Sequence, residues 1–342
     1  MIGFRVDANE IIASGHMMRC IAIATQCMKL GQECLFILAE EKETQRLKEK
    51  KIPYVILNSQ WNDLEKELDV LLELVQKKSL DWLVVDSYQV TVSYLAKLNQ
   101  AVPVLYMDDM GTEKYSVSAL VHYGLHSEKL PFLKEYEREG IKVLDGVSYI
   151  PLREEFLLEE SDNCRENSIL ITTGGTDPYN ITGKVISLCL TQSVFDEYEF
   201  HVIVGSMNQY EEELQKLALQ NQRIHLHKNV KNMSDYMRKC QMAVSAGGTT
   251  LFELCACGIP TVCFSFADNQ EPGTKEMDRR KVMPYAGDAR RDAVDYTIVS
   301  YLKDFLQNDL RKEYSEGMVR LVDGKGALRI AKALLLEGRN LE

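Results

Sequence analysis

No run of apolar residues in this 342-residue sequence approaches the roughly 18 residues that a helix needs to cross a membrane. The opening segment, MIGFRVDANE, has no basic stretch followed by an apolar core, so we expect no secretory signal in it. The sequence also lacks the Gly-Lys-Ser/Thr phosphate-binding loop and the G-x-G-x-x-G dinucleotide fingerprint. These absences argue against a membrane-spanning protein, a P-loop ATPase and an NAD-dependent enzyme.

The sequence contains fewer basic than acidic residues. The chain has 40 lysines and arginines against 51 aspartates and glutamates, a net charge of −11 and a pI near 5.2. A phosphate backbone would be repelled by such a surface, so nucleic acid is a poor partner. Local basic pockets remain able to hold one small anion.

Paired cysteines are not evident either. The nine cysteines are an odd number, and most lie inside apolar runs such as "LCL" and "VCF". We therefore expect buried, reduced thiols in a cytoplasmic protein in preference to disulfides. Cys255 and Cys257 are spaced C-x-C with no second pair, which is a weak zinc signal.

What the chain does contain is a regular alternation of short apolar runs and longer helical patterns. The runs are "IGFRV", "CLFIL", "PYVIL", "DWLVVD" and "VPVLYMD" in the first half, and "SILITT", "FHVIVG", "RIHLH", "MAVSA" and "PTVCFS" in the second. Strand–helix alternation predicts an α/β protein with parallel sheets covered by helices on both faces. Runs that are apolar throughout fit strands buried on both sides.

The alternation breaks once, at the charged segment 153–167, which we interpret as a linker. Residues 1–152 then form an N-terminal Rossmann-like domain, and residues 168–342 a C-terminal one that ends in helices beyond Asp295. Two doubly wound domains of this kind are expected to face a central cleft at the carboxyl ends of their strands, where ligands bind.

The first candidate loop, "ASGHMMRC", joins the opening strand to the first helix. Gly15 allows a tight turn, and His16 falls in the first helical turn. The positive helix N-terminus disfavours an imidazolium, and a neutral imidazole is what a general base requires. The alternative is structural: Ser14 caps the helix while His16 packs against the loop.

The second candidate loop, "TTGGTDPYN", carries Gly174 and Gly175, whose bare backbone N–H groups suit a ligand or a facing loop. Asp177 is predicted to be the N-cap of the next helix and Pro178 its first residue. A plain capped turn explains the same residues equally well.

The third candidate loop, "AGGTTLFE", places Gly247 and Gly248 before a helix. Its N–H groups and the hydroxyls of Thr249 and Thr250 are suited to cradling a phosphate. Glu253, one turn later, is placed to accept hydrogen bonds from two neighbouring hydroxyls, such as those of a ribose. The alternative is a capping box formed by Thr250 and Glu253.

Other residues give weaker signals. Asp86 and Tyr88 end a strand, so we expect both side chains to point into the cleft; a merely polar strand end is the alternative. The amides of Asn269 and Gln270 follow another strand, where they suit recognition of a sugar or uracil. The paired acids of "MDDMG" (107–111) have no third ligand nearby, so we do not expect a metal there.

Together these motifs resemble the PseG/SpsG family of nucleotide-sugar hydrolases, which shares the two-domain GT-B fold of MurG-type glycosyltransferases. The opening signature R-x-D-A-x-x-x-I-x-x-G-H-x-M-R-C runs from Arg5 to Cys20. The match continues in order through D-x-Y (86–88), Y-x-D-D (106–109), P-L-R-x-E-F (151–156), G-G-T-D-P (174–178), A-G-G-T-T-x-x-E (246–253) and D-N-Q (268–270).

The resemblance implies hydrolysis of UDP-2,4-diacetamido-2,4,6-trideoxy-β-L-altropyranose to UDP and free sugar, with no cofactor and no metal. It implies a role in pseudaminic-acid-type or spore-coat polysaccharide biosynthesis. The family's catalytic histidine and active-site tyrosine fall on His16 and Tyr88, and its uridine diphosphate site on the Gly248–Glu253 segment. The sugar-contacting pair falls on Asn269 and Gln270. We take a further five residues as substrate-binding: Gly15, Arg19, Gly174, Gly175 and Gly247.

Two departures from the family pattern stand out. Ala13 replaces a glycine that usually precedes the G-H pair, and "EPGTKEMDRRKVMP" replaces an alanine-rich helix after "DNQ". The second departure bears on the identity of the sugar more than on the reaction.

UDP is a good leaving group, so the reaction needs no carboxylic acid of the glycosidase type. The hypothesis is that His16 takes a proton from water as it attacks C1, while Tyr88 orients the water or the sugar. A GT-B glycosyltransferase, in which His16 deprotonates an acceptor hydroxyl, is the first alternative. A non-catalytic nucleotide-sugar binding module is the second.

Overall fold

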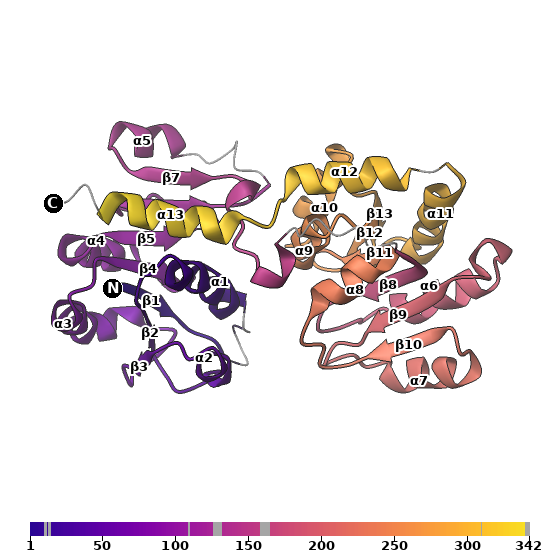
Figure 1. Cartoon of the computed structure of the whole chain (residues 1–342), viewed down its shortest axis with the longest axis horizontal. Helices are drawn as coiled ribbons and strands as arrows, with labels where there is room; N and C mark the ends of the chain where they lie inside the picture. Colours follow the sequence, from indigo (N-terminus) through magenta and orange to yellow (C-terminus); the bar gives the residue numbers. More distant parts are fainter. Residues whose placement is uncertain are drawn as a thin grey trace. The chain divides into compact units, whose positions relative to one another are not determined.

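The computed structural model describes residues 1–9, 12, 15–108, 110–125, 132–157, 165–308 and 310–338 (Figure 1). The chain forms two compact units. Unit 1 comprises Met1–Glu154 together with Gly324–Glu342, and unit 2 comprises Glu155–Asp323.

Unit 1 is built on a seven-stranded sheet with the order β3-β2-β1-β4-β5-β6-β7, in which every pairing is parallel. Its strands are β1 (Ile2–Val6), β2 (Cys34–Leu38), β3 (Tyr54–Ile56), β4 (Trp82–Asp86), β5 (Val104–Met107), β6 (Ala119–His122) and β7 (Lys142–Asp145). Its helices are α1 (Gly15–Lys29), α2 (Gln45–Glu49), α3 (Leu68–Lys78), α4 (Val92–Ala101), α5 (Leu133–Arg138) and α13 (Gly326–Gly338), with short 3₁₀ turns at Leu64–Glu67 and Val147–Tyr149. The central strands β1 and β4 are buried along their whole length, as expected for uninterrupted apolar runs.

Unit 2 has a six-stranded parallel sheet with the order β10-β9-β8-β11-β12-β13. Its strands are β8 (Glu166–Thr172), β9 (Glu199–Ile203), β10 (Ile224–His227), β11 (Cys240–Ala246), β12 (Thr261–Ser265) and β13 (Tyr285–Asp288). Its helices are α6 (Ile181–Leu190), α7 (Glu211–Gln220), α8 (Met233–Lys239), α9 (Thr250–Ala256), α10 (Glu271–Arg279), α11 (Val294–Gln307) and α12 (Arg311–Leu321), with a 3₁₀ turn at Ser193–Phe195. Both sheets are parallel and both alternate with helices, so the predicted α/β class with two doubly wound domains is confirmed.

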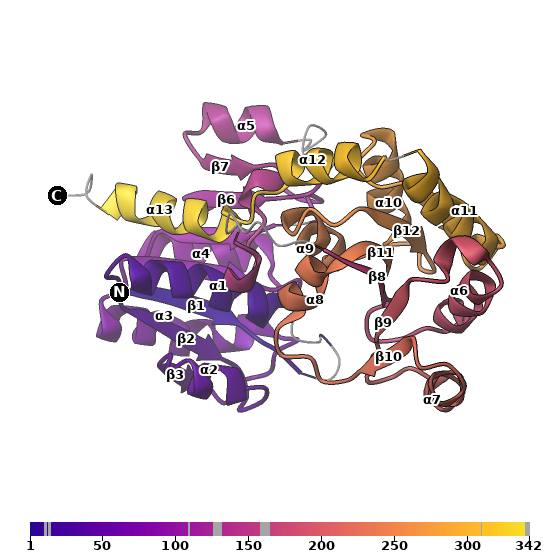
Figure 2. The ribbon, with the colours of Figure 1, turned by 45° about the vertical axis from the view of Figure 1, so that its right-hand side comes forward.

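The C-terminal helix corrects the predicted division of the chain. We expected 168–342 to form one domain, but α13 packs beside α1 in unit 1, as both views of the ribbon show (Figures 1 and 2). The Nη1 atom of Arg329 donates to the carbonyl of Ser148 at 2.9 Å, and the apolar face of α13 is buried. An amphipathic helical pattern shows that a helix has a buried face, but not which sheet it covers. The other boundary, between Glu154 and Glu155, falls inside the predicted linker.

A buried charge network fixes the carboxyl end of β1, just before the first candidate loop. Arg5 is fully buried and donates to Asp7 at 2.5 Å and to Glu67 at 2.9 Å. The hydroxyl of Tyr94 also donates to Glu67 at 2.9 Å, and the N–H of Ala39 donates to Asp7 at 2.8 Å. Arg5 is one cation facing two carboxylates, so the Tyr94 hydroxyl and the Ala39 N–H supply further hydrogen bonds that stabilise the remaining buried negative charge.

Close backbone approach fixes the loop after β8 in unit 2. A Cβ atom on Gly205 would lie 2.3 Å from the carbonyl oxygen of Gly174 and 2.5 Å from the carbonyl carbon of Gly175. The N–H of Met207 donates to the carbonyl of Gly175 at 3.0 Å, which ties the loops after β8 and β9 together. Gly205 is therefore required by space, and the position of Gly174 and Gly175 depends on it.

We predict that Gly205→Ala lowers the free energy of unfolding by roughly 1–3 kcal/mol, because the new methyl group meets backbone that cannot swing aside. Gly273→Ala is the matched control, since a Cβ there has no atom within 4 Å and the residue lies in α10. That control should be neutral or stabilising by up to about 1 kcal/mol. Urea titrations of both variants would measure the difference, and equal stabilities would contradict the prediction.

Three histidines stack on one face of the sheet at the β9–β10 edge. The His201 ring lies 5.0 Å from that of His225 and 5.2 Å from that of His227, and its Nδ1 atom is 2.9 Å from Nε2 of His227. His201 is 5% exposed, and burial together with its two histidine neighbours lowers its pKa to about 4. The folded chain therefore binds this proton less readily than the unfolded chain does.

A lowered histidine pKa contributes stability that is fully present above pH 6.5 and is lost as the pH falls from 6.5 toward 4. We predict that His201→Gln weakens this loss, reducing the difference in unfolding free energy between pH 7.5 and pH 4.5 by roughly 1–2 kcal/mol. Denaturant titrations of wild type and variant across this range provide the measurement. An identical pH dependence in the two proteins would show that His201 does not carry it.

Candidate active site

His16 lies at the carboxyl edge of the unit 1 sheet and is 8% exposed. It is the second residue of α1, and its Nδ1 atom is 2.6 Å from Oδ1 of Asp86, the last residue of β4. Strands β1 and β4 are neighbours, with Val6 opposite Asp86. Parallel pairing therefore brings together a helix start and a strand end that are 70 residues apart in sequence.

Asp86 is buried, yet it is held in its charged form. Arg19, one turn along α1 from His16, donates from Nε to Oδ2 at 2.5 Å and from Nη2 to Oδ1. Burial on its own would raise the pKa of Asp86, but the charge of Arg19 and the hydrogen bonds from Arg19 and His16 outweigh it and lower the pKa to about 2. Arg19 also contacts the hydroxyl of Tyr123 through Nη1.

The ionised carboxylate selects the tautomer of His16. A carboxylate without a proton can only accept, so the 2.6 Å contact requires Nδ1 of His16 to be the donor. In the neutral ring the Nε2 atom then carries the lone pair. Nη2 of Arg19 also lies 2.8 Å from Nδ1, but a protonated Nδ1 cannot accept from it, so the two groups are held side by side by the Asp86 oxygen to which both donate. This is the arrangement that a histidine base oriented by a carboxylate requires.

Tyr88 follows β4 and packs edge-on against His16, with ring centroids 4.6 Å apart and an interplanar angle of 79°. Its side chain is 52% exposed. The structure thus brings together four of the unit 1 residues singled out in the sequence: Gly15, His16, Arg19 and Tyr88. Ala13 and Ser14 lie outside the described residues, so the proposed Ser14 cap is not addressed.

Two contributors were not assigned site roles from the sequence. Asp86 was expected, with Tyr88, to point into the cleft from a strand end but was given no role, although its register opposite Val6 gives it the central position in the cluster. Tyr123 follows β6, a strand that the apolar-run pattern missed. The described contacts of Arg19 are with Asp86, His16 and Tyr123, which makes it a residue that holds Asp86 in place. Its predicted substrate contact remains a prediction.

In unit 2, the loop after β11 combines a space constraint with an open backbone. A Cβ on Gly247 would lie 2.8 Å from Cβ of Gln270 and 2.9 Å from Cγ2 of Thr274, so glycine lets this loop touch the start of α10. Gly248 has φ +149°, and a Cβ on it would have no atom within 4 Å; both Gly248 and Thr249 are exposed. The backbone beside these two residues is therefore accessible to a ligand.

The capping-box alternative for this loop is wrong. Helix α9 begins at Thr250, so its N-cap is Thr249, whose side chain makes no capping hydrogen bond. Thr250 is already inside the helix and Glu253 lies one turn further on, half-buried. The role of Glu253 in accepting hydrogen bonds from ribose hydroxyls stays a prediction.

The loop after β12 places the predicted sugar-contacting amides differently from one another. Asn269 is exposed, whereas the Oε1 atom of Gln270 accepts a hydrogen bond from the N–H of Phe266 at 2.9 Å. One acceptor position of the Gln270 amide is thus used to shape its own loop.

The loop after β8 corrects a local prediction. Helix α6 begins at Ile181 and not at Pro178, and its N-cap is Asn180, with φ +51°. Asp177, 2% exposed, still stabilises the helix start, because its carboxylate accepts from the N–H groups of Ile181 and Thr182 at 2.8 and 2.9 Å. A turn between Asp177 and Asn180 separates the carboxylate from the helix, which residue spacing alone did not indicate.

Several absences hold for the part of the chain that the structure describes. No group of three histidine, cysteine, aspartate or glutamate side chains is gathered as metal ligands there. Within the same ranges no helix combines the length and apolar character needed to traverse a bilayer. The eight described cysteines, Cys255 and Cys257 among them, are buried free thiols.

Similar known proteins are found both for the C-terminal part of the chain and for the chain as a whole. Residues 169–313 match the glycosyltransferase family 28 C-terminal domain. The chain is 22% identical to the spore coat polysaccharide biosynthesis protein SpsG of Bacillus subtilis over 342 residues, covering 97% of each protein.

Two further relatives are longer proteins. One is a Helicobacter pylori protein named as a pseudaminic acid cytidylyltransferase and UDP-2,4-diacetamido-2,4,6-trideoxy-β-L-altropyranose hydrolase, at 23% identity over 77% of this chain and 44% of that protein. The other is an uncharacterised protein of Methanocaldococcus jannaschii, at 24% identity over 76% of this chain and 54% of that protein. The chain therefore spans about half the length of each of these two.

Solved structures with the same fold include MurG of Acinetobacter baumannii, with a TM-score of 0.66 at 12% identity over 98% of this chain and 99% of that one. A complex of S. aureus MnaA with UDP has a TM-score of 0.66 at 12% identity over 96% and 94%. The predicted GT-B fold is thereby confirmed, and the relatives agree with the resemblance drawn from the motifs. The chain is thus similar in sequence to SpsG and to the Helicobacter hydrolase, and its matched domain and its fold are of the glycosyltransferase-like type.

Proposed function

We propose that this protein hydrolyses a UDP-activated diacetamido-trideoxy sugar at its anomeric C–O bond, releasing UDP and the free sugar. The observation that carries the proposal is the hydrogen bond between His16 Nδ1 and the ionised Asp86, which leaves Nε2 of the neutral ring as an acceptor. The Helicobacter relative named as such a hydrolase supports the choice of reaction. With SpsG as a second relative, we place the reaction in pseudaminic-acid-type or spore-coat polysaccharide biosynthesis.

The proposed step is a single displacement. Nε2 of His16 takes a proton from a water molecule as the water oxygen bonds to C1 of the sugar. The C1–O bond to the β-phosphate breaks, and its electron pair leaves with UDP. The resulting imidazolium is stabilised by Asp86, whose negative charge lies 2.6 Å from Nδ1. General-base assistance of this kind contributes about 10²–10⁴-fold to the rate.

The surrounding residues divide the remaining tasks. Tyr88, packed against the ring of His16, orients the water or the sugar. Arg19 fixes Asp86, and because a Cβ on Gly15 would meet no atom within 4 Å, the space beside His16 is open and we keep Gly15 as a substrate-binding candidate. No acid is required on the leaving side, because a diphosphate departs as an anion.

In unit 2, we assign UDP to the segment Gly248–Glu253. The open backbone at Gly248 and Thr249 is suited to stabilising the charge that grows on the diphosphate. Glu253 is assigned to the ribose hydroxyls, and Asn269 and Gln270 to the sugar. Gly247 lets its loop approach the start of α10 closely, and Gly174 has a positive φ of +79°. We keep both, together with Gly175, as substrate-binding candidates.

A GT-B glycosyltransferase is the second candidate, favoured by the match of residues 169–313 to the glycosyltransferase family 28 C-terminal domain. It would use the same His16–Asp86 pair to deprotonate a hydroxyl of an acceptor in place of water. The two candidates differ in whether UDP appears when no acceptor is present.

We predict UDP release from at least one member of a panel of UDP-diacetamido-trideoxy sugars without any acceptor. In ¹⁸O-water the released UDP should contain no label, because the attack is at carbon. UDP is the informative product, since the anomeric hydroxyl of the free sugar exchanges with water by itself. Label in UDP would indicate attack at phosphorus, and release only after addition of an acceptor would identify a glycosyltransferase.

We predict that His16→Asn and Asp86→Asn each slow turnover by about 10²–10⁴-fold while the affinity for UDP is unchanged. Asn at position 86 donates to Nδ1 and so stabilises the tautomer with a protonated Nε2. Because Asp86 acts through His16, the double variant should be no slower than His16→Asn alone.

Initial rates and calorimetric titration with UDP measure the two effects, and thermal unfolding checks that each variant is folded. His225→Asn, in strand β10 of unit 2, changes a histidine to which no role is assigned; it is the control and should turn over normally. Near-normal turnover of a folded His16→Asn variant would refute the role given to His16.

A further inference from the structure

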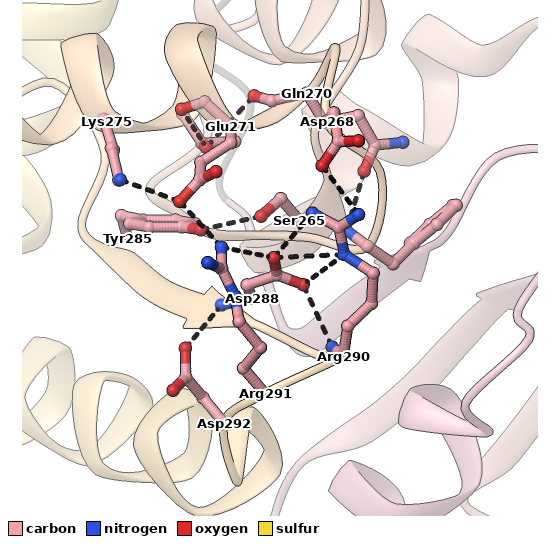
Figure 3. A network of polar contacts seen from close by, with 12 residues as sticks. Ser265, Asp268, Gln270, Glu271, Lys275, Tyr285, Asp288, Arg290, Arg291 and Asp292 are labelled. Atoms are coloured by element: carbon pink, nitrogen blue, oxygen red, sulfur yellow. Dashed lines mark hydrogen bonds and ion pairs between the residues drawn. The ribbon is translucent and has the colours of Figure 1, made fainter.

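Two consecutive arginines share one buried carboxylate at the end of β13. Asp288 is 1% exposed and accepts from Nη2 of Arg290 at 2.8 Å and from Nη2 of Arg291 at 2.7 Å (Figure 3). Nε of Arg290 also donates to Asp288 at 3.0 Å, so that guanidinium is held at two points. The backbone N–H of Asp288 donates to Asp292 at 2.8 Å.

From this anchor both arginines reach the segment between β12 and α10. The remaining Nη1 of Arg290 lies 2.7 Å from Oδ1 of Asp268, and Nη2 of Arg291 lies 3.0 Å from Oε1 of Glu271. Lys275, on α10, makes a second ion pair with Glu271 at 2.7 Å (Figure 3). Asp268 and Glu271 flank Asn269 and Gln270 in sequence, so the residues on both sides of these two amides form ion pairs.

The arrangement is stronger than an isolated surface ion pair. The Asp268 side chain is 92% exposed, and an exposed pair of this kind normally gains little because two long side chains must be immobilised. Here the arginine is already fixed by two hydrogen bonds to a buried carboxylate, so little further entropy is lost when Nη1 meets Asp268. The three cations also each have an acidic partner, which argues against a separate anion site at this cluster.

We propose that Arg290 and Arg291, held by Asp288, are positioning residues that keep the Asp268–Glu271 segment in the conformation that receives the sugar. They act on the affinity for the sugar part of the substrate and leave the affinity for UDP unchanged. This inference rests on the proposed function, in which Asn269 and Gln270 contact the sugar. It gives a role to Glu271 and Lys275 of the charged "EPGTKEMDRRKVMP" stretch, which replaces the alanine-rich helix that the family resemblance led us to expect after "DNQ".

Arg290→Gln tests the proposal, because it should change KM for the UDP-sugar and leave kcat and the Kd of UDP unchanged. KM for the UDP-sugar should rise about three- to five-fold, the range expected for losing one such ion pair, while kcat and the Kd of UDP stay within error. Asp268→Asn should have the same effect without disturbing the Arg290–Asp288 contact. The double variant should be no worse than either single one, because both remove the same interaction.

Arg279→Gln is the matched control, since Arg279 forms its ion pair with Glu276 within α10 itself. It should leave KM unchanged. Arg290→Lys should fail to restore KM, because an ammonium cannot bind Asp288 at two points and still reach Asp268. A parallel rise in KM and in the Kd of UDP, or additive effects in the double variant, would overturn the proposal.

Hydrogen exchange separates this proposal from the proposed function. In the free protein, the backbone amides of 266–271 should exchange faster in Arg290→Gln and Asp268→Asn than in wild type, and those of Arg279→Gln should not. If wild type releases no UDP from any UDP-sugar, the proposed function fails while this comparison still decides whether the arginines hold the segment. Unchanged exchange at 266–271 in both variants would refute the positioning role.

Discussion

The contact between His16 and Asp86 is the constraint on which the chemistry of unit 1 depends. A buried carboxylate is costly unless its charge is compensated, and here Arg19 and the N–H of His16 provide that compensation. The result is a carboxylate that remains ionised, with its pKa lowered to about 2, and therefore acts only as an acceptor. The same contact that stabilises the burial of Asp86 also dictates which nitrogen of His16 carries the proton.

In unit 2 the corresponding feature is backbone that is accessible at the carboxyl edge of the sheet. Two glycines, Gly205 and Gly247, are required because neighbouring loops approach too closely for a Cβ atom. A third, Gly248, has an open side and a positive φ. The first two bring loops from different strands into contact, and the third is exposed just before α9. Charged side chains around Asp288 then stiffen the adjacent loop, so rigidity and access are supplied by different residues.

The sequence patterns predicted most of the strands, including the edge strands β3 and β10, but not the partners of His16 in its cluster. Most of the apolar runs proved to be central strands, because burial on both faces imposes an apolar composition, whereas "PYVIL" and "RIHLH" contain the edge strands β3 and β10. Strands β6, β7 and β13 were missed because "ALVH", "KVLD" and "YAGD" are short and lack a clear period. His16 was recognised from its motif, whereas Tyr123 and the central role of Asp86 depend on strand order, which no local pattern records. The position of α13 beside α1 depends on tertiary packing, which no local sequence pattern records either.

The protonation state of the cluster also bears on the kind of leaving group that it can serve. Glycosidases that expel an alkoxide keep one carboxyl group protonated as a general acid, and they raise its pKa to do so. Asp86 is pushed in the opposite direction by Arg19, so at neutral pH it has no proton to give. A cluster of this kind can supply a base and stabilise an imidazolium, but Asp86 cannot protonate a departing oxygen. It is therefore suited to a substrate whose leaving group departs as a stable anion, as a nucleoside diphosphate does, and both hydrolysis and glycosyl transfer from a nucleotide sugar meet that requirement.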